Sequence, residues 1–210
     1  RDASPALIDP HTELADLVDP WIGANGAGSC PPGACLPHAS IYPSPNTLVS
    51  AASGYAAGSP LVGFGQLHAS GAGSSTLSYG NFLVSPRIGL AINEADHASP
   101  MVDAVARPYS FTAKLTRWNI ACTLAPAANT AIYEFVYPQS TDARLNFDVA
   151  RKLGRTDAMT SGSVEIDPVN GVISGGGTFD GNWNPAPYTL YFYAKVDQTP
   201  ISAGTWTGTI

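Results

Sequence analysis

Apolar and polar residues alternate along much of the chain, which is the pattern of half-buried β-strands. In residues 109–116, Phe111, Ala113 and Leu115 fall on one face and polar residues on the other. Residues 187–197 repeat the pattern with larger side chains. A helix of the usual period would place its apolar residues three and four apart, so these segments are predicted as strands of a sheet with one face against a core.

Strand-like segments recur about ten times between turn residues, without the alternation of strand and helix that a parallel sheet requires. One of them, residues 163–177, contains Asn170-Gly171, the strongest short signal for a β-hairpin. We therefore predict an all-β fold, a large antiparallel β-sandwich of about ten or more strands. The other strands are expected at residues 39–44, 63–69, 81–89, 109–116, 120–127, 131–138, 143–150, 187–197 and 204–210.

Helices are expected to be at most one or two and short. Residues 12–20 could form one, with Thr12 as the N-cap and Pro20 as the stop, and residues 147–155 are a thinner second possibility. Residues 23–80 are rich in Gly, Ser and Pro, so this region should hold long loops. We find no break in composition, and predict one domain over residues 1–210 with a lead at residues 1–16.

The composition excludes some classes of function but does not identify one. The net charge is −6, with 12% charged residues, and no basic cluster exceeds Arg151-Lys152 with Arg155. Nucleic acid is therefore excluded as an expected partner, because its binding needs a basic face. No apolar run approaches the roughly 20 residues that span a bilayer. Residues 1–13 read as the trimmed start of a mature chain.

The cysteines give a weak indication of compartment. Cys30 and Cys35 flank a short loop and could form a disulfide worth roughly 2 kcal/mol, whereas Cys122 is remote in sequence. A metal clip is the alternative, but only His38 lies nearby as a further ligand, so no metal is expected here. A bridge and the low lysine content favour a secreted, periplasmic or otherwise extracellular protein.

Few residues carry the pattern of a catalytic site. No pair of carboxylates, calcium loop or serine nucleophile signature stands out, so no catalytic residue is predicted in this chain. His68 lies in "GFGQLHASGAG" and reads either as a ligand-facing residue or as a histidine bonded to a backbone carbonyl. Trp183 lies in "FDGNWNPAPY" and could stack on a sugar ring or plug the end of the sandwich.

Several stretches together resemble glycoside hydrolase family 92, the exo-acting α-mannosidases. "LVDPWIGANGAG" (17–28) is similar to the family's "VDPFIGTGGxG", and "PPGACLPHASIYPSPNT" (31–47) to its "PGAxxPFGMVxLSPDT". "GFGQLHASGAGSSTLSYGNFLVSP" (63–86) resembles "GFSHTHLSGTGxxDYGDIxLMP". With weaker matches such as "LNFDVARKL" (145–153), the resemblance runs in order from about residue 17 to 201.

The resemblance implies that this chain is the N-terminal β-sandwich of such an enzyme. In the family, a helical α/α barrel carries the acid and base carboxylates and the calcium site, and the reaction inverts the anomeric centre. A 210-residue chain has no room for that barrel, so we expect the chain alone to be inactive, with no cofactor of its own. Its partners would be the helical catalytic domain or chain and a mannoside or other glycan.

The resemblance also selects candidate sugar-binding residues. They are His68, Gln66, Ser70, Gly71, Gly73, Trp183 and Asn184. Gln66 stands where the family has the first of two histidines, and Ser78 where it has an acidic residue, which leaves altered specificity open. Three hypotheses follow: a domain that shapes the sugar pocket and braces a catalytic domain, a stand-alone carbohydrate-binding module, or a structural docking module that binds no sugar.

Overall fold

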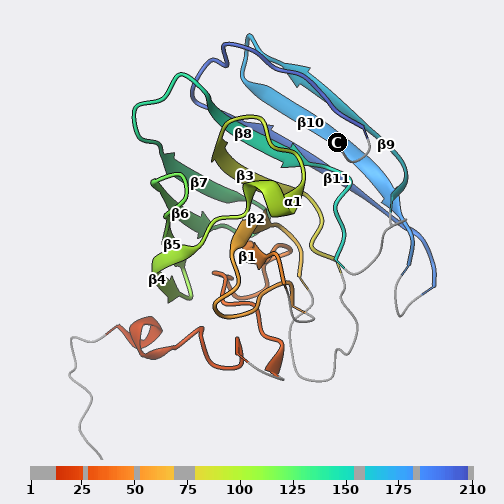
Figure 1. The fold of residues 1–210 in the computed structure, drawn as a ribbon. Coiled ribbons are helices and arrows are strands. Elements are labelled where there is room, and N and C mark those ends of the chain that lie inside the picture. The colour runs from red at the N-terminus through yellow and green to blue at the C-terminus, as the bar shows by residue number, and fades with distance from the viewer. Residues whose placement is uncertain are drawn as a thin grey trace, which may run out of the picture.

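The strands of the protein form three antiparallel sheets (Figure 1), as seen in a computed structural model. The structure describes residues 13–25, 28–49, 53–68, 79–153, 159–181 and 185–207. Within these ranges it contains eleven strands, one short 3-10 helix, η1 (Leu14–Leu17), and one single-turn α-helix, α1 (Glu94–His97). The predicted all-β class is confirmed, with three sheets in place of the two layers of a simple sandwich.

The first sheet is a meander of four consecutive strands. It comprises β4 (Met101–Arg107), β5 (Ser110–Leu115), β6 (Ile120–Pro126) and β7 (Ala131–Val136), in that order. The alternation predicted in β5 is confirmed, because Phe111, Ala113 and Leu115 are all buried. Their common face supplies most of the main hydrophobic core.

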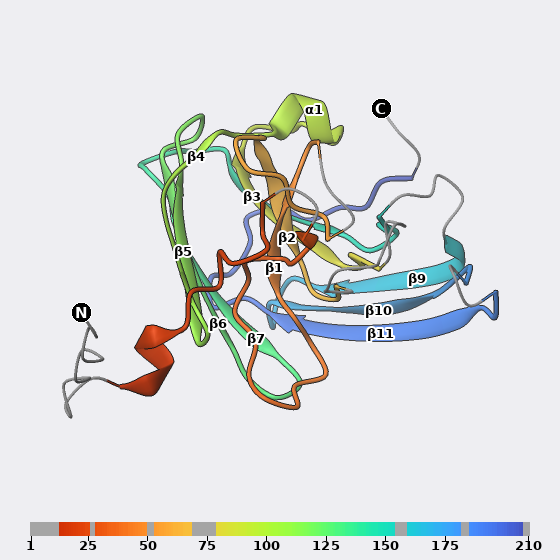
Figure 2. The same ribbon diagram turned by 90° about the horizontal axis from the view of Figure 1, so that it is seen from below.

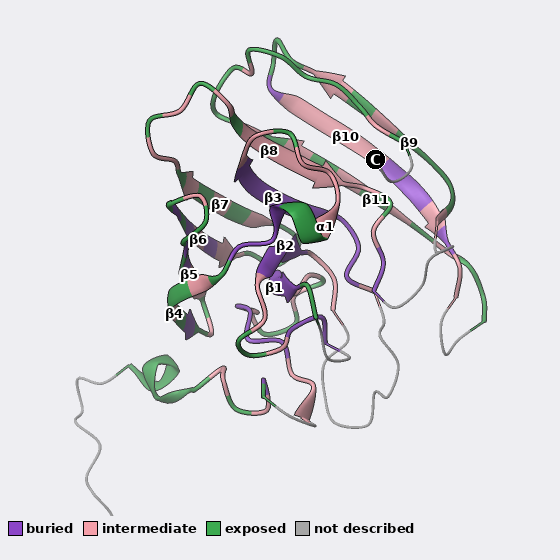
Figure 3. Cartoon of the chain, viewed as in Figure 1, coloured by how far each residue is buried: buried purple, intermediate pink, exposed green. Residues whose placement is uncertain are grey.

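The second sheet lies between the other two (Figures 1 and 2). It comprises β1 (Ser44–Thr47), β2 (Leu61–Gly65), β3 (Leu83–Ile88) and β8 (Ala143–Asp148), in that order. Every residue of β1 and β2 is buried, as expected of strands that are covered on both faces (Figure 3). Phe64 of β2 joins the main core, where its ring lies 6.2 Å from that of Phe111.

The third sheet is formed by β9 (Met159–Asp167), β10 (Val172–Phe179) and β11 (Tyr188–Lys195), with β10 in the middle. The predicted hairpin is confirmed: Asp167 pairs with Val172, and Gly171 in the turn has φ +65°. The inner face of this sheet packs on Phe82, whose ring centroid lies 4.9 Å from that of Phe192.

Several boundaries differ from the predictions. Residues 39–43 are not in a strand, and β1 begins at Ser44. Residues 204–207 form no strand, and residues 208–210 lie outside the described part. The helix considered for residues 147–155 is absent from residues 147–153, since β8 continues to Asp148, and 154–155 are not described. Of the helix considered for residues 12–20, only η1 is present.

Two elements were not predicted, β4 and α1. In β4 the pairing with β5 shifts register between Val102 and Val105, and Asp103 has φ +53°, so the strand carries a bulge. Only Ala106 of this strand is buried, so the strand needs no alternation of apolar and polar residues, and its sequence shows none. Helix α1 is a single turn and is too short for a hydrophobic period to mark it.

Candidate functional site

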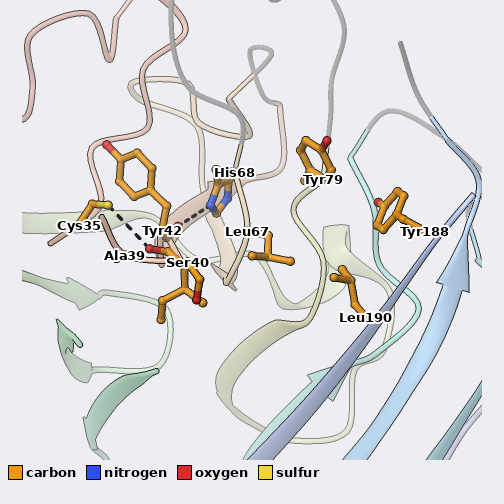
Figure 4. A pocket seen from close by; sticks show the side chains of 10 residues that line it. Cys35, Ala39, Ser40, Tyr42, Leu67, His68, Tyr79, Tyr188 and Leu190 are labelled. Carbon is orange, nitrogen blue, oxygen red and sulfur yellow. Dashed lines mark hydrogen bonds between the residues drawn. The ribbon is translucent and has the colours of Figure 1, made fainter. Parts of the chain in front are cut away.

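A cavity of about 400 Å³ opens where the loop before β1, the residues after β2 and the start of β11 come together (Figure 4). His68, one of the predicted sugar-binding residues, forms part of its wall. The rest is mainly aromatic or aliphatic, and no carboxylate lines the cavity in the described part of the chain. The lining residues are Cys35, Ala39, Ser40, Ile41, Tyr42, Leu67, His68, Tyr79, Tyr188 and Leu190.

Both ring nitrogens of His68 are engaged inside the protein. Nδ1 lies 2.7 Å from the Tyr42 carbonyl, which can only accept, so the proton is on Nδ1 (Figure 4). Nε2 then carries a lone pair and accepts a hydrogen bond from Asn46 Nδ2 at 3.0 Å. The hydrogen bonds thus define one neutral tautomer, and both nitrogens already have a partner.

Electrostatics keeps this imidazole neutral. Burial lowers the pKa of His68 to about 4, and the nearby Arg151 guanidinium acts in the same direction, although the bond to the Tyr42 carbonyl opposes it. At neutral pH His68 is therefore uncharged, and with its nitrogens occupied it is not arranged as a proton donor or acceptor for a ligand. The arrangement favours the structural reading of His68, a histidine bonded to a carbonyl.

Behind His68 a chain of polar contacts runs into the interior. The Asn46 amide is completely buried, donates also to the Gly54 carbonyl at 3.2 Å, and lies with Oδ1 3.5 Å from Arg151 Nη1. Arg151 in turn donates from Nε to Glu94 Oε1 of α1 at 2.5 Å. The contacts connect the pocket wall to β1, α1 and the segment after β8, so the wall is held from three directions.

Three tyrosines give the pocket its aromatic character. The rings of Tyr79 and Tyr188 meet edge to face with centroids 5.7 Å apart, and Tyr188 also stacks on Phe179 at 5.6 Å. The hydroxyl of Tyr42 donates to the Pro31 carbonyl at 2.7 Å, and burial raises the pKa of Tyr42 to about 12. Aromatic rings in a fixed orientation can pack against the C–H face of a sugar.

Gln66 does not line the cavity. Its amide nitrogen donates to the Phe64 carbonyl at 3.3 Å and to the hydroxyl of Tyr133 in β7, so the side chain points toward the first sheet. Regular alternation would place Gln66 and His68 on the same face. However, β2 ends at Gly65 and the chain bends at residue 66, so the two side chains reach different partners. The other predicted sugar-binding residues, Ser70, Gly71, Gly73, Trp183 and Asn184, lie outside the described residues.

A backbone bridge joins His68 and Tyr79, the described residues on either side of positions 69–78. His68 and Tyr79 form an isolated antiparallel bridge, and Gly80 N donates to the Leu67 carbonyl at 2.6 Å. Tyr79 has φ +62°, a conformation that turns the chain toward β3. Two residues eleven positions apart in sequence therefore stand side by side on the pocket wall.

Cys30 and Cys35 do not form the predicted disulfide in the structure, where both are free thiols. The Cys30 thiol donates to the Gly28 carbonyl at 3.5 Å, whereas that of Cys35 lies within reach of the Leu36 and Ile41 carbonyls. The two sulfurs are thus directed to separate backbone groups. In the described ranges, no three His, Cys, Asp or Glu side chains are grouped to hold a metal ion.

The residues that hold the site together carry no recognisable motif in the sequence. Arg151 and Lys152 were noted only as the densest basic cluster, but Lys152 is buried, lies over the Tyr188 ring at 5.6 Å, and donates to the Asp180 carbonyl. Asn46 lies within residues 31–47, where the family resemblance assigns it no role. Charged residues next to an apolar strand end, as in "FDVARKL", were the available signal for inward-facing cations.

Comparisons with known proteins agree on one group of enzymes. Residues 17–210 match the profile of the glycosyl hydrolase family 92 N-terminal domain. A family 92 α-mannosidase from Bacteroides thetaiotaomicron, solved alone and in complex with mannoimidazole, superposes with a TM-score of 0.78 and 26% identity over 89% of this chain. The family 92 glycosyl hydrolase ccman5 superposes with a TM-score of 0.74 at 24% identity over 86% of the chain.

The match covers only part of those structures. In each case the chain spans 26% of the length of the solved enzyme. No curated protein matches the sequence. Among the described residues, no helix is both long and apolar enough to cross a membrane.

Proposed function

The chain belongs to the glycosyl hydrolase family 92 N-terminal domain family, and we propose that it forms one wall of the sugar pocket of an α-mannosidase-like glycoside hydrolase and braces a separate helical catalytic domain. The observation that carries this proposal is the pocket of about 400 Å³, whose described lining residues form an aromatic wall and include no carboxylate. Inverting hydrolysis needs two carboxyl groups on either side of the bond. A wall without them is suited to binding and needs a second domain for catalysis.

In this proposal the pocket recognises the sugar mainly through shape and C–H contacts. Tyr79 and Tyr188 present aromatic edges and faces, and His68 presents ring carbons, since its nitrogens are bound to Tyr42 and Asn46. His68 then acts as a positioning residue that fixes the wall. Ser70, Gly71, Gly73, Trp183 and Asn184 remain proposed sugar contacts from the resemblance.

The bracing role is supported by apolar side chains that the fold leaves in water. Leu14, Leu17, Val18 and Ile22 are between 51% and 75% exposed, all within one short segment at the start of the described chain. A contiguous exposed apolar stretch of this kind typically marks an interface with another protein or domain. We assign this segment to contact with the catalytic domain.

Two further parts of the proposal rest on the resemblance. The calcium ion of the complete enzyme would belong to the helical domain, and no residue of this chain is assigned to it. A glycan-processing enzyme of this family would act outside the cytoplasm, so a secreted or periplasmic location is proposed.

The decisive test is an assay of the 210-residue chain with an aryl α-mannoside in the presence of calcium. No sugar release above the uncatalysed rate is expected, because the described lining residues include no carboxyl group that could act as acid or base. Calcium-dependent turnover by the pure chain would contradict the proposal.

Binding is tested separately, by titrating methyl α-mannoside while recording backbone amide spectra. Shifts at Leu67, Tyr79 and Tyr188 are expected, and Tyr188→Ala should weaken binding about tenfold through loss of the stacked ring. Tyr109→Ala is the matched control, because Tyr109 is 45% exposed in the turn between β4 and β5 and does not line the pocket. Shifts without any weakening in Tyr188→Ala would remove this tyrosine from the proposed wall.

A further inference from the structure

The outer face of the third sheet carries a second hollow, separate from the pocket. The sheet lies at one side of the molecule (Figures 1 and 2), and Leu190 of β11 lines the pocket while the next residue, Tyr191, points to the opposite face. The hollow measures about 500 Å³. Its side chains come from all three strands, mainly Ser161, Ser163, Ser174, Thr178, Thr189, Tyr191 and Tyr193.

Two tyrosines on this face are unusually exposed. Tyr191 and Tyr193 are 82% and 69% exposed, and as alternate residues of one strand they stand roughly 7 Å apart along β11. Large aromatic rings usually have much of their surface buried in a folded domain. Both rings are therefore available to an external partner.

A glycine leaves the outer face of the third sheet flat at its centre. Gly176 of β10 pairs with Tyr191 across the strands, and a Cβ on Gly176 would stand 2.6 Å from Tyr191 Cδ1. The aromatic ring therefore lies over the glycine backbone and occupies the space where a side chain would project. A ring that lies across a sheet presents its face, which is the surface that stacks on a sugar.

Hydroxyl groups surround the rings, and charge is confined to one end of the sheet. Ser163 lies opposite Gly176 on the other side of β10, and Thr178 and Thr189 share a hydrogen bond of 2.9 Å. The charged residues of this face, Glu165, Asp167 and Lys195, lie toward the Asn170-Gly171 turn. The centre of the face therefore offers aromatic rings and neutral donors and acceptors.

We propose that this face, formed by Tyr191, Tyr193, Gly176 and the neighbouring Ser and Thr hydroxyls, is an accessory binding site for a neutral oligosaccharide. Pyranose rings combine an apolar C–H face with hydroxyls at the rim, which matches tyrosine faces bordered by Ser and Thr. The site would hold a glycan chain on the face of the sheet opposite the pocket, and it does not depend on the role proposed for that pocket.

The chemistry of the face favours a glycan over other partners. A nucleic acid would need basic side chains, and the central hollow has none. The fully buried core of a protein interface is typically its most apolar part, whereas the tyrosine rings here are bordered by glycine, serine and threonine, and no aliphatic side chain of the described residues lines the hollow. Ser, Thr and Tyr hydroxyls that remain accessible can instead exchange water for sugar hydroxyls at little cost.

The test titrates mannopentaose and, separately, cellopentaose into the 210-residue chain while following backbone amide shifts and heat. Shifts at Gly176, Ser163 and Thr189 are expected with at least one of the two probes. Tyr191→Ala and Tyr193→Ala should each weaken that binding about tenfold, as expected for the loss of one stacked ring. Tyr191→Phe keeps the ring and should stay within about threefold of the original affinity.

Tyr109→Ala serves as the matched control, because it removes a 45% exposed tyrosine from the turn between β4 and β5 and should leave the affinity unchanged. Circular dichroism and melting curves verify that the variants are folded. Binding of neither probe to the outer face, or equal affinity in the Tyr191→Ala and Tyr193→Ala variants, overturns the proposal. Shifts confined to Leu67, Tyr79 and Tyr188 would do the same, while supporting the pocket as a sugar site.

Discussion

His68 lines the pocket, but the hydrogen bonds of its ring stabilise the pocket wall and are not directed to a ligand. Its Nδ1 proton is donated to the Tyr42 carbonyl, and its Nε2 lone pair receives the Asn46 amide. Losing the side chain would remove both hydrogen bonds. The Asn46 amide would keep its bond to the Gly54 carbonyl, whereas the Tyr42 carbonyl would lose its bond to the imidazole, at a cost of about 1–3 kcal/mol. The same geometry makes the stability of the fold sensitive to acid.

Acid is expected to destabilise the protein through His68. In the folded protein the pKa of His68 is about 4, below the ordinary 6.5. At pH values between these two, His68 binds a proton in the unfolded chain but not in the folded one. The free energy of unfolding therefore falls as the pH drops from 6.5 to 4, by about 3 kcal/mol at most, and His68 adds no slope above 6.5. Burial lowers the pKa of His97 too, which adds a loss of the same sign.

Urea unfolding at pH 7 and pH 4.5 measures this effect. In His68→Gln the difference between the two pH values should shrink by about 2–3 kcal/mol relative to the unmodified chain. His38→Asn is the control, since His38 is exposed and its replacement should leave the difference unchanged. An unaltered pH difference in His68→Gln would contradict the low pKa assigned to this residue.

The Arg151–Glu94 pair is expected to matter for stability, unlike the exposed Arg144–Asp142 pair. The side chain of Arg151 is only 9% exposed, so Glu94→Gln would leave a largely buried guanidinium without its carboxylate. We expect a loss of about 2 kcal/mol in the free energy of unfolding, below the value for fully buried pairs because Glu94 is 34% exposed.

Asp142→Asn provides the comparison, because its pair with Arg144 has side chains 38% and 47% exposed. A loss below about 1 kcal/mol is expected there, since solvent screens the attraction. Chemical unfolding of both variants at pH 7 gives the two values. Equal losses would mean that burial does not set the strength of these pairs.

At the scale of elements, the turn between β9 and β10 depends on glycine for two reasons. Gly171 has φ +65°, and a Cβ there would stand 2.7 Å from the Val196 carbonyl oxygen. Gly58 also has a positive φ, +77°, but a Cβ there would meet no atom within 4 Å. The two sites together separate backbone strain from steric contact.

Gly58→Ala is expected to cost about 1 kcal/mol from the backbone conformation alone, and Gly171→Ala about 2–3 kcal/mol because the contact is added. Thermal or urea unfolding of the two single variants measures the difference. A smaller loss at Gly171 than at Gly58 would contradict the close approach to Val196.

The elements that could be predicted are those with regular local patterns. Strand β5 and the Asn170-Gly171 hairpin are confirmed, because each is encoded within a few neighbouring residues. Strand β4 was missed since its bulge at Asp103 breaks the alternation on which the prediction depends. The split into three sheets was likewise out of reach, because it follows from pairings such as that of β3 with β8 across about sixty residues.

At the scale of the whole molecule, the candidate site was only half accessible to sequence reasoning. His68 lines a pocket as the resemblance suggested, yet Gln66 bonds to Tyr133, and the supporting contacts come from Asn46, Glu94 and Arg151. Residues so distant in sequence carry no local signal that they meet. Only the fold reveals that the densest basic cluster has its Arg151 and Lys152 in the interior.

The exposed apolar segment gives a prediction for the molecule as a whole. Leu17→Ser with Ile22→Ser should shift the melting temperature by no more than about 2 °C, because both side chains are already in water. Self-association, followed by sedimentation, should fall at the same time. Leu61→Ser, at a site only 2% exposed, is the contrasting variant and should unfold the protein at a much lower temperature.

The bridge between His68 and Tyr79 has an evolutionary consequence. Because the backbone bridge holds His68 and Tyr79 side by side, the ten-residue sequence between them can change in length without separating these two residues. Doubling its length would add only about 0.6 kcal/mol of closure entropy. Relatives of this domain can therefore differ in the number of residues between these two positions while the sheets keep their pairing.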